Sequence, residues 1–405
     1  MPPSPPPSRP HPESLAIGAL LTVLVALGQI SISLYVPSMP SLVAEMGTSA
    51  ERVSLTLSYF LAGFAMAQLV YGPLSDRFGR RPVLLGGIVL YLAASLACAL
   101  AGTIEALIVA RVVQGMGACA GPVLGRAIVR DVYGRERAAQ VLAYIGLAFA
   151  ISPAVTPIVG GYLQVWLGWR ANFYLLTALA ALVFWAVWLM LGETNRRPDP
   201  GALRPSGMAS NYVKMLRTPE YVGYMLSLTF VFAGLMTYVA VAPFVFIDTI
   251  GLTPDIFGLV NVFNVVGFII GTVAAGRLTP GVGLARMVGA GIVLCLLGGA
   301  AMAGTALAGH VSVVAIVMPL TVFTAGMGMV FPNAMAGAMG PFPRAAGAAS
   351  ALLGFFQMGV AAAVSALAGW LPHATHLSMG LIITGAVAVA LVGFSVLVGW
   401  RRLAS

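Results

Sequence analysis

Long apolar segments alternate with short polar ones along this chain of 405 residues. Each apolar segment holds about 20 residues, the length that an α-helix needs to cross a hydrocarbon core about 30 Å thick. Only helices and closed barrels satisfy their backbone hydrogen bonds in lipid, and these segments are too long for barrel strands. The pattern therefore predicts an all-α integral membrane protein with twelve spans, at 15–36, 53–71, 83–101, 104–124, 141–163, 173–191, 222–246, 257–278, 287–307, 311–329, 347–371 and 379–398.

A polar stretch at 192–220 divides these spans into two halves. We expect six-helix bundles at 15–191 and 221–398, a cytoplasmic linker between them, and tails at 1–14 and 399–405. Gly115-Met116-Gly117 recurs as Gly326-Met327-Gly328 at an offset of 211, and Gly160-Gly161-Tyr162-Leu163 matches Gly369-Trp370-Leu371 at a similar offset. This agreement favours two six-helix repeats with a substrate site near the membrane midplane.

Composition agrees with this interpretation. Hydrophobic residues make up 60% of the chain and its mean hydropathy is +0.97, and a soluble fold of this size cannot bury so much apolar surface.

The positions of lysine and arginine predict the orientation. With both termini in the cytoplasm, Arg52 and Arg170 are the only cations in outer loops and Arg111 lies within a span, so 18 of the 21 cations lie inside. The net charge of +9 is spread over many short loops, which indicates membrane anchoring and no nucleic-acid partner. The proline-rich segment MPPSPPPSRPHPES is expected to be a disordered cytoplasmic tail and not a signal peptide.

Several functional classes are excluded by missing motifs. An ATP-driven pump needs a G-x-x-x-x-G-K-[ST] loop, which the chain lacks. The four histidines lie in the tail or in outer connections, so no catalytic set faces one cavity and we do not expect an enzyme. The cysteines show no metal or redox spacing, which predicts no metal site and no cofactor.

One short string concentrates charge between the second and third spans. GPLSDRFGRRPVLLGG, residues 72–87, is expected to be a short inner loop. Inner anchoring explains its arginines but not Asp76. An acid there can accept backbone N–H bonds at the start of the next helix, and a glycine permits a tight turn.

This string resembles the signature loop of the major facilitator superfamily. The resemblance implies a cytoplasmic latch of the outward-facing state, built by Gly72, Asp76, Arg77, Gly79, Arg80 and Arg81. Arg130 and Asp131, in RAIVRDVYGRERAA, would supply the partner at the inner end of span 4. Alternatively, Asp131 pairs with Arg135 one helical turn further on.

Three further strings resemble the Bcr/CflA group of bacterial drug-efflux transporters. They are RVVQGMGACAGPVLGRAIVRDVY at 111–133, SPAVTPIVGGYLQVWLGWRANF at 152–173 and AAGAASALLGFFQM at 345–358. The resemblance implies a monomer in the bacterial inner membrane that exports small amphipathic molecules by alternating access, with the proton gradient as energy source. Export or facilitated passage of an endogenous metabolite on the same fold is the alternative.

Arg111 begins the first of these strings and lies about 10 Å into span 4. A charged side chain at that depth is costly, so it indicates a functional site, unless it snorkels to the outer interface. Gln114 shares its helix face. In the family, the matching arginine is associated with substrate and proton coupling.

Other polar side chains in the spans must find partners or face water. Together with Arg111 and Gln114, the candidate substrate-binding residues are Gln29, Ser33, Asn261, Asn264 and Gln357. Some of them would instead form structural hydrogen bonds between helices.

The fifth span holds a candidate hinge. Pro153 and Pro157 remove backbone donors, and Gly160 with Gly161 permits close helix approach. Such a helix can seal one side of a cavity, whereas ordinary small-residue packing is the alternative.

One position departs from the family pattern. The first span reads SLYVP where the family usually reads D-M-Y-L-P, so Ser33 replaces a carboxylate, and no Asp or Glu lies near the middle of any span. We therefore expect neutral or weakly anionic substrates, with proton coupling through a peripheral carboxylate or the substrate itself.

Overall fold

The fold was analysed in a computed structural model that describes residues 14–133, 135–195, 198–203, 205–371 and 375–399. This part of the chain is helical and contains no strand. Its α-helices are α1 (Leu15–Ser33), α2 (Met39–Glu45), α3 (Ala50–Phe78), α4 (Arg80–Leu100), α5 (Ile104–Ala118), α6 (Ala120–Val132), α7 (Arg135–Leu167), α8 (Arg170–Met190), α9 (Pro205–Leu216), α10 (Pro219–Pro243), α11 (Pro254–Val282), α12 (Leu284–Leu307), α13 (Val313–Met339), α14 (Ala346–Trp370) and α15 (Leu377–Phe394). Short 3-10 or π turns add η1 (Val36–Ser38), η2 (Phe244–Thr249), η3 (Pro343–Ala345) and η4 (Ser395–Gly399).

The prediction of twelve spans is confirmed: in the described part of the chain, twelve helical segments are long and apolar enough to cross a membrane. Prolines explain where a span is broken into two helices. Pro37 and Pro40 separate α1 from α2, and Pro122 cannot donate to the carbonyl of Ala118 where α5 gives way to α6. Spans 1 and 4 each consist of two consecutive helical segments for this reason.

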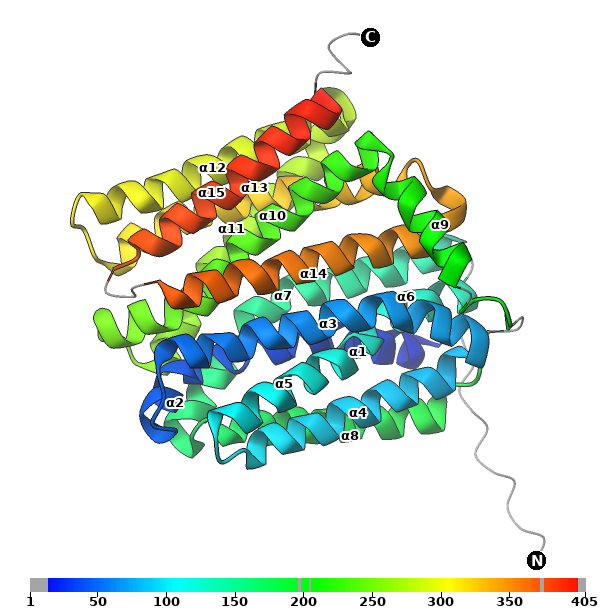
Figure 1. Ribbon diagram of the computed structural model, residues 1–405, viewed down its shortest axis with the longest axis horizontal. Helices are drawn as coiled ribbons and strands as arrows, with labels where there is room; N and C mark the ends of the chain where they lie inside the picture. The colour runs from blue at the N-terminus through cyan, green and yellow to red at the C-terminus, as the bar shows by residue number, and fades with distance from the viewer. Residues whose placement is uncertain (1–13, 134, 196–197, 204, 372–374, 400–405) are drawn as a thin grey trace, which may run out of the picture.

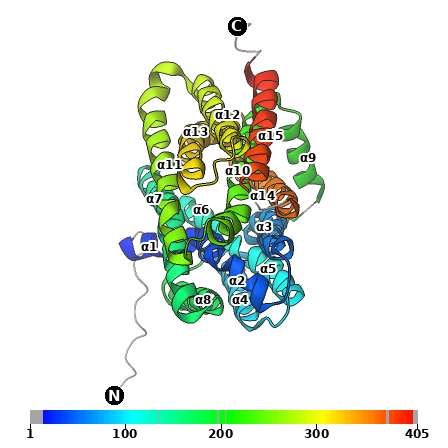
Figure 2. The same ribbon diagram turned by 90° about the vertical axis from the view of Figure 1, so that its left-hand side faces the viewer.

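The helices form two bundles, one from α1 to α8 and one from α10 to α15 (Figures 1 and 2). The linker between them contains α9, which lies along one end of the molecule and packs on α10 and α14. We call the end that carries α9 the inner end, and the end that carries α2 the outer end. The predicted tails lie outside the described residues, apart from Ser14 and Gly399.

The two bundles repeat the same backbone devices. Gly79 joins α3 to α4 at φ +98°, and Gly283 joins α11 to α12 at φ +90°, a conformation that favours glycine. The Gly-Met-Gly strings of both halves lie at close helix contacts: Gly117 packs against Tyr91 of α4, and Gly326 packs against Cys295 of α12.

The bundles meet at the outer end, where α3 packs on α14 and α7 on α11. The Ser58 hydroxyl lies 3.0 Å from that of Ser365, and the Ser54 hydroxyl donates to the carbonyl of Ala240 at 3.3 Å. Gly161 allows α7 to approach the backbone of Asp255 on α11. The outer end is therefore closed by direct contact between the bundles.

Candidate functional site

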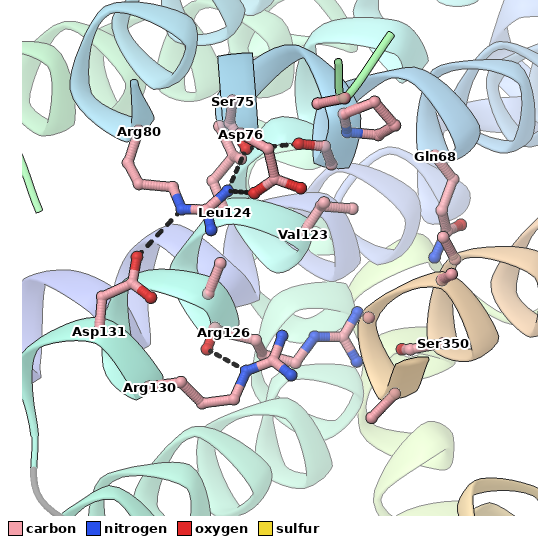
Figure 3. Close-up of a pocket in the computed structure, with 18 of the residues that line it drawn as sticks. Gln68, Ser75, Asp76, Arg80, Val123, Leu124, Arg126, Arg130, Asp131 and Ser350 are labelled. Carbon is pink, nitrogen blue, oxygen red and sulfur yellow. Dashed lines mark hydrogen bonds and ion pairs between the residues drawn. The ribbon is translucent and has the colours of Figure 1, made fainter. Parts of the chain in front are cut away.

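A cavity of about 850 Å³ lies between the bundles at the inner end. Its walls come from α3 and α6 on one side and from α13 and α14 on the other, and α9 lines it at the inner end. Gln68, Arg126 and Ser350 are among the lining residues (Figure 3). Apolar side chains such as Val123, Leu124 and Met335 line it beside the polar ones, so a molecule with both apolar and polar parts fits it better than an ion does. The bundles are in contact at the outer end, so the cavity lies at the inner end, the end that carries α9.

Arg80 ties three helices together at the mouth of this cavity. Its Nη1 donates to Asp76 of α3 at 2.5 Å, and its Nε donates to Asp131 of α6 at 3.0 Å. Nη1 also reaches the Ser75 hydroxyl. Of the two partners considered for Asp131, the structure shows an arginine of the signature string, whereas the side chain of Arg135 lies outside the described part of the chain.

The prediction of a short loop at 72–87 is wrong. The helices α3 and α4 run through it and leave only Gly79 between them, because its positive φ lets the chain reverse within one residue. Asp76 does not cap the next helix as expected, because its carboxylate forms an ion pair with the Arg80 side chain. Instead, the Glu193 carboxylate accepts hydrogen bonds from the backbone N–H groups of Arg80 at 2.8 Å and Arg81 at 3.1 Å. A carboxylate from the linker thus caps the N-terminus of α4.

The linker holds the end of α3 as well. Asn195 donates its side-chain N–H to the carbonyl of Asp76 at 2.9 Å, and the backbone N–H of Asp199 reaches the same carbonyl at 3.0 Å. Sequence reasoning missed Glu193 and Asn195. Their signal was a short polar run, GETN, directly after the sixth span.

Two arginines of the string, Arg77 and Arg81, do not line the cavity. Arg81 donates to the carbonyl of Trp188 at 2.8 Å and stacks on its ring, whereas Arg77 lies over Phe78. Gly72 lines the cavity and has open space around its Cα. Only part of the predicted latch set is therefore brought together here.

Arg111 lies wholly inside the first bundle, with no exposed surface, so it does not snorkel. Its Nη1 donates to Gln114 Oε1 at 2.6 Å, and its guanidinium carbon is 4.4 Å from the ring centre of Phe60 and 5.0 Å from that of Tyr35. The Nε and Nη2 atoms have no hydrogen-bond partner among the described residues. Aromatic faces thus take the place of a carboxylate around this cation.

The other predicted binding residues form local pairs. The amide of Gln29 donates to the Ser33 hydroxyl at 3.2 Å, and Asn264 donates to Asn261 at 3.3 Å. Gln357 is half-buried in α14. None of the seven predicted substrate residues lines the described cavity, so their role in binding stays a prediction.

The cavity itself is lined by polar residues that sequence reasoning did not select. Gln68 of α3 is 5% exposed, and its Oε1 has no partner among the described residues. Arg126 and Ser350 face it from α6 and α14. In the sequence, the available signals for these residues were a lone amide in span 2, which is Gln68, and the first arginine of RAIVRD, which is Arg126. Their shared cavity depends on how the bundles meet.

The candidate hinge lies on α7, which continues through Pro153 and Pro157 without a break. A Cβ at Gly160 would overlap the carbonyl oxygen of Leu34, and Gly258 of α11 packs against the carbonyl of Pro157. These residues therefore lie where α7 contacts α1 within the bundle and α11 across the bundles.

Comparison with known proteins agrees with this architecture. The sequence profile described as the Major Facilitator Superfamily matches residues 21–366. The chain belongs to this superfamily of transporters.

Two curated relatives are drug-resistance proteins by name. The chain is 29% identical over 386 residues to multidrug resistance protein D of Escherichia coli K12, with 95% of each chain covered. It is 28% identical over 374 residues to a bicyclomycin resistance protein homolog of Haemophilus influenzae, with 92% of this chain and 94% of the relative covered.

A solved structure supports the fold. The xylose transporter XylE from E. coli, in a partially occluded inward-open conformation, superposes with a TM-score of 0.73 at 18% identity and covers 95% of this chain and 97% of its own. This likeness shows the fold, and the family match assigns the chain to transporters and not to enzymes.

Proposed function

We propose that this protein is a secondary active transporter that exports small amphipathic molecules, drugs among them, across the bacterial inner membrane. The observation that carries the proposal is the cavity between the bundles, open at the inner end and bounded outward by the contact of α3 with α14 and of α7 with α11. A cavity with one open end is what alternating access requires. The drug-resistance names of the relatives support the substrate class.

The orientation follows from charge. The outer end carries Arg52 and Arg170, each beside a carboxylate: Glu105 at 2.6 Å and Glu45 at 3.7 Å, respectively. Most other cations gather toward the inner end, which supports cytoplasmic termini. The protein would act as a monomer with a bilayer and a small molecule as its partners.

A peripheral carboxylate that the cavity can reach is one route to proton antiport. Asp76 and Asp131 line the cavity and share Arg80 between them. Protonation of either carboxylate would remove one partner of Arg80 and loosen the tie among α3, α4 and α6. We propose this group, and not a carboxylate at the membrane centre, as the proton-coupling site.

The test is accumulation of neutral, anionic and cationic antibiotics in a pump-deficient bacterium that expresses the protein. Export predicts lower accumulation of at least one charge class than in cells with empty vector, and a protonophore should abolish the difference. Asp131→Asn should do the same, and Asp255→Asn, at the start of α11, serves as the control. Unchanged accumulation of every compound at verified expression would contradict the proposal.

Ser33 favours a second candidate, an exporter or facilitator of an endogenous metabolite. Serine is uncharged, so this position, which is acidic in the pattern of the resembling family, carries no charge here. The Ser33 hydroxyl accepts a hydrogen bond from the Gln29 amide. Proteoliposome counterflow separates the candidates, since a metabolite carrier would exchange cell extract compounds and leave antibiotics untouched.

A further inference from the structure

Two arginines on one face of α6 line the cavity. Arg126 and Arg130 are four residues apart, so they lie one above the other on the helix. Arg126 is half-buried and lies about 9 Å from the inner end of α6. Figure 3 shows both guanidinium groups directed from α6 toward α14, on which Ser350 lies.

Both side chains bend away from the cytoplasmic interface. Arg126 Nε donates to the carbonyl of Pro122 at 2.7 Å, and Arg130 Nε donates to the carbonyl of Arg126 at 3.3 Å. These acceptors lie one turn deeper in the membrane. An arginine that only anchored the helix to lipid headgroups would extend toward the interface, so simple anchoring does not explain this geometry.

The terminal N–H groups of these arginines lack anionic partners. In the described part of the chain neither guanidinium forms an ion pair, whereas Asp76 and Asp131 are engaged by Arg80. Asp199, the remaining acid of the cavity wall, accepts from the backbone of Gly201 at 2.8 Å. Two like charges one turn apart repel each other, so an anion between them would be stabilised by both.

The surrounding wall suits the rest of an amphipathic molecule. Val123 and Leu124 flank the arginines on α6, and Met335 and Met339 face the cavity from α13. Gln68 lies where α3 and α14 approach each other, close to Gly354, and offers an amide to a second polar group. The cavity therefore has one cationic corner and a mostly apolar remainder.

We propose that Arg126 and Arg130 form a binding site for the anionic head of an amphipathic substrate, such as a carboxylate or a sulfonate. The guanidinium groups would bind the head through paired N–H donors while Val123 and Met335 contact the apolar body. This inference rests on the proposed transport function and names a substrate class for its cavity. It places the charged substrate contact in the inner cavity and not at Arg111, which is enclosed in the first bundle.

Binding of one fluorophore with three head charges tests the site. The purified full chain in phosphatidylcholine nanodiscs is titrated at pH 7.5 with dansylglycine, dansylglycinamide and dansylcadaverine. Dansylglycine should bind about tenfold more tightly than the amide. Arg126→Gln and Arg130→Gln should each remove about this tenfold preference and leave amide binding within about twofold. Arg286→Gln, which removes an exposed inner cation outside the cavity, should change neither affinity.

The controls keep the outcomes distinct. Arg126→Lys retains the charge without the paired donors and should keep part of the preference, which a folding defect would not do. Equal loss of both ligands in Arg126→Gln, or no preference in the wild-type protein, overturns the site. Repetition with phosphatidylglycerol nanodiscs identifies a lipid occupant: if this lipid abolishes wild-type dansylglycine binding, the corner binds headgroups and the substrate assignment is overturned.

Failure of this inference is separable from failure of the proposed function. If neutral antibiotics are exported while dansylglycine binds no more tightly than dansylglycinamide, the transporter assignment is supported and only the anion site is contradicted. If there is neither export nor tighter binding of dansylglycine, both proposals are contradicted.

Discussion

The hydroxyl groups of Ser58 and Ser365 meet 3.0 Å apart, although 307 residues separate them in the chain. Ser58 belongs to α3 of the first bundle and Ser365 to α14 of the second. Both are buried, so this contact lies within the closed outer interface. Any outward opening of the cavity must separate this pair.

We therefore expect a disulfide between Ser58→Cys and Ser365→Cys to block transport. The three native cysteines are buried and would be replaced first. Oxidation should form the bond and stop export, and a reductant should restore it. Each single variant should transport with or without oxidant. Full transport by quantitatively cross-linked protein would show that the bundles do not separate at this point.

Gln114 is predicted to stabilise the protein through Arg111. Its Oε1 is the only side-chain acceptor of that buried guanidinium among the described residues. Gln114→Leu should lower the free energy of unfolding by about 1–3 kcal/mol, because a buried charged donor loses its partner. Gln114→Glu should cost less, since it keeps an acceptor and adds a counter-charge. Thermal unfolding in detergent gives the comparison, and equal melting temperatures of the two variants would contradict it.

Gly160 is predicted to be intolerant of even one methyl group. A Cβ there would overlap the carbonyl oxygen of Leu34, which is backbone and cannot move aside as a flexible side chain would. Gly160→Ala should therefore destabilise the protein and reduce export, through overpacking of about 1–3 kcal/mol. Gly146→Ala, on the same helix with open space at its Cα, should be neutral or slightly stabilising. Similar melting temperatures for the two variants would argue against close packing of α7 on α1.

His376 is predicted to make stability depend on pH. It lies just before α15, fully buried, with Nε2 3.1 Å from the Thr305 hydroxyl, and burial lowers the pKa of its imidazole. The unfolded chain therefore binds the proton more readily, so stability should fall as the pH drops below about 6.5. Above that value both states are neutral and the effect vanishes.

Melting temperatures between pH 5 and pH 8 test this dependence. His376→Gln should flatten the curve on its acidic side, because Gln does not titrate. His310→Gln, an exposed histidine at the same end of the molecule, should leave the curve unchanged. A curve that keeps its acidic slope in His376→Gln would assign the slope to other groups.

The sequence alone determined the class of the protein and the number of its spans. Apolar runs of spanning length have one stable solution in lipid, since each helix satisfies its own backbone. The string around Asp76 and Arg80 also placed the charged inner end. These are local properties, which spacing and composition carry without knowledge of the partner helices.

The tertiary structure decided which residues share a space. The sequence correctly predicted that Arg111 and Gln114 share a helix face, and the structure shows that they form a hydrogen bond. Only the packing of α3 and α8 shows that aromatic rings surround the Arg111 guanidinium. Likewise, Glu193 caps a helix that begins 113 residues earlier, and Arg126 faces Ser350 across two bundles. Such contacts depend on helix rotation and bundle docking, to which many distant side chains contribute small energies, and no short segment encodes them.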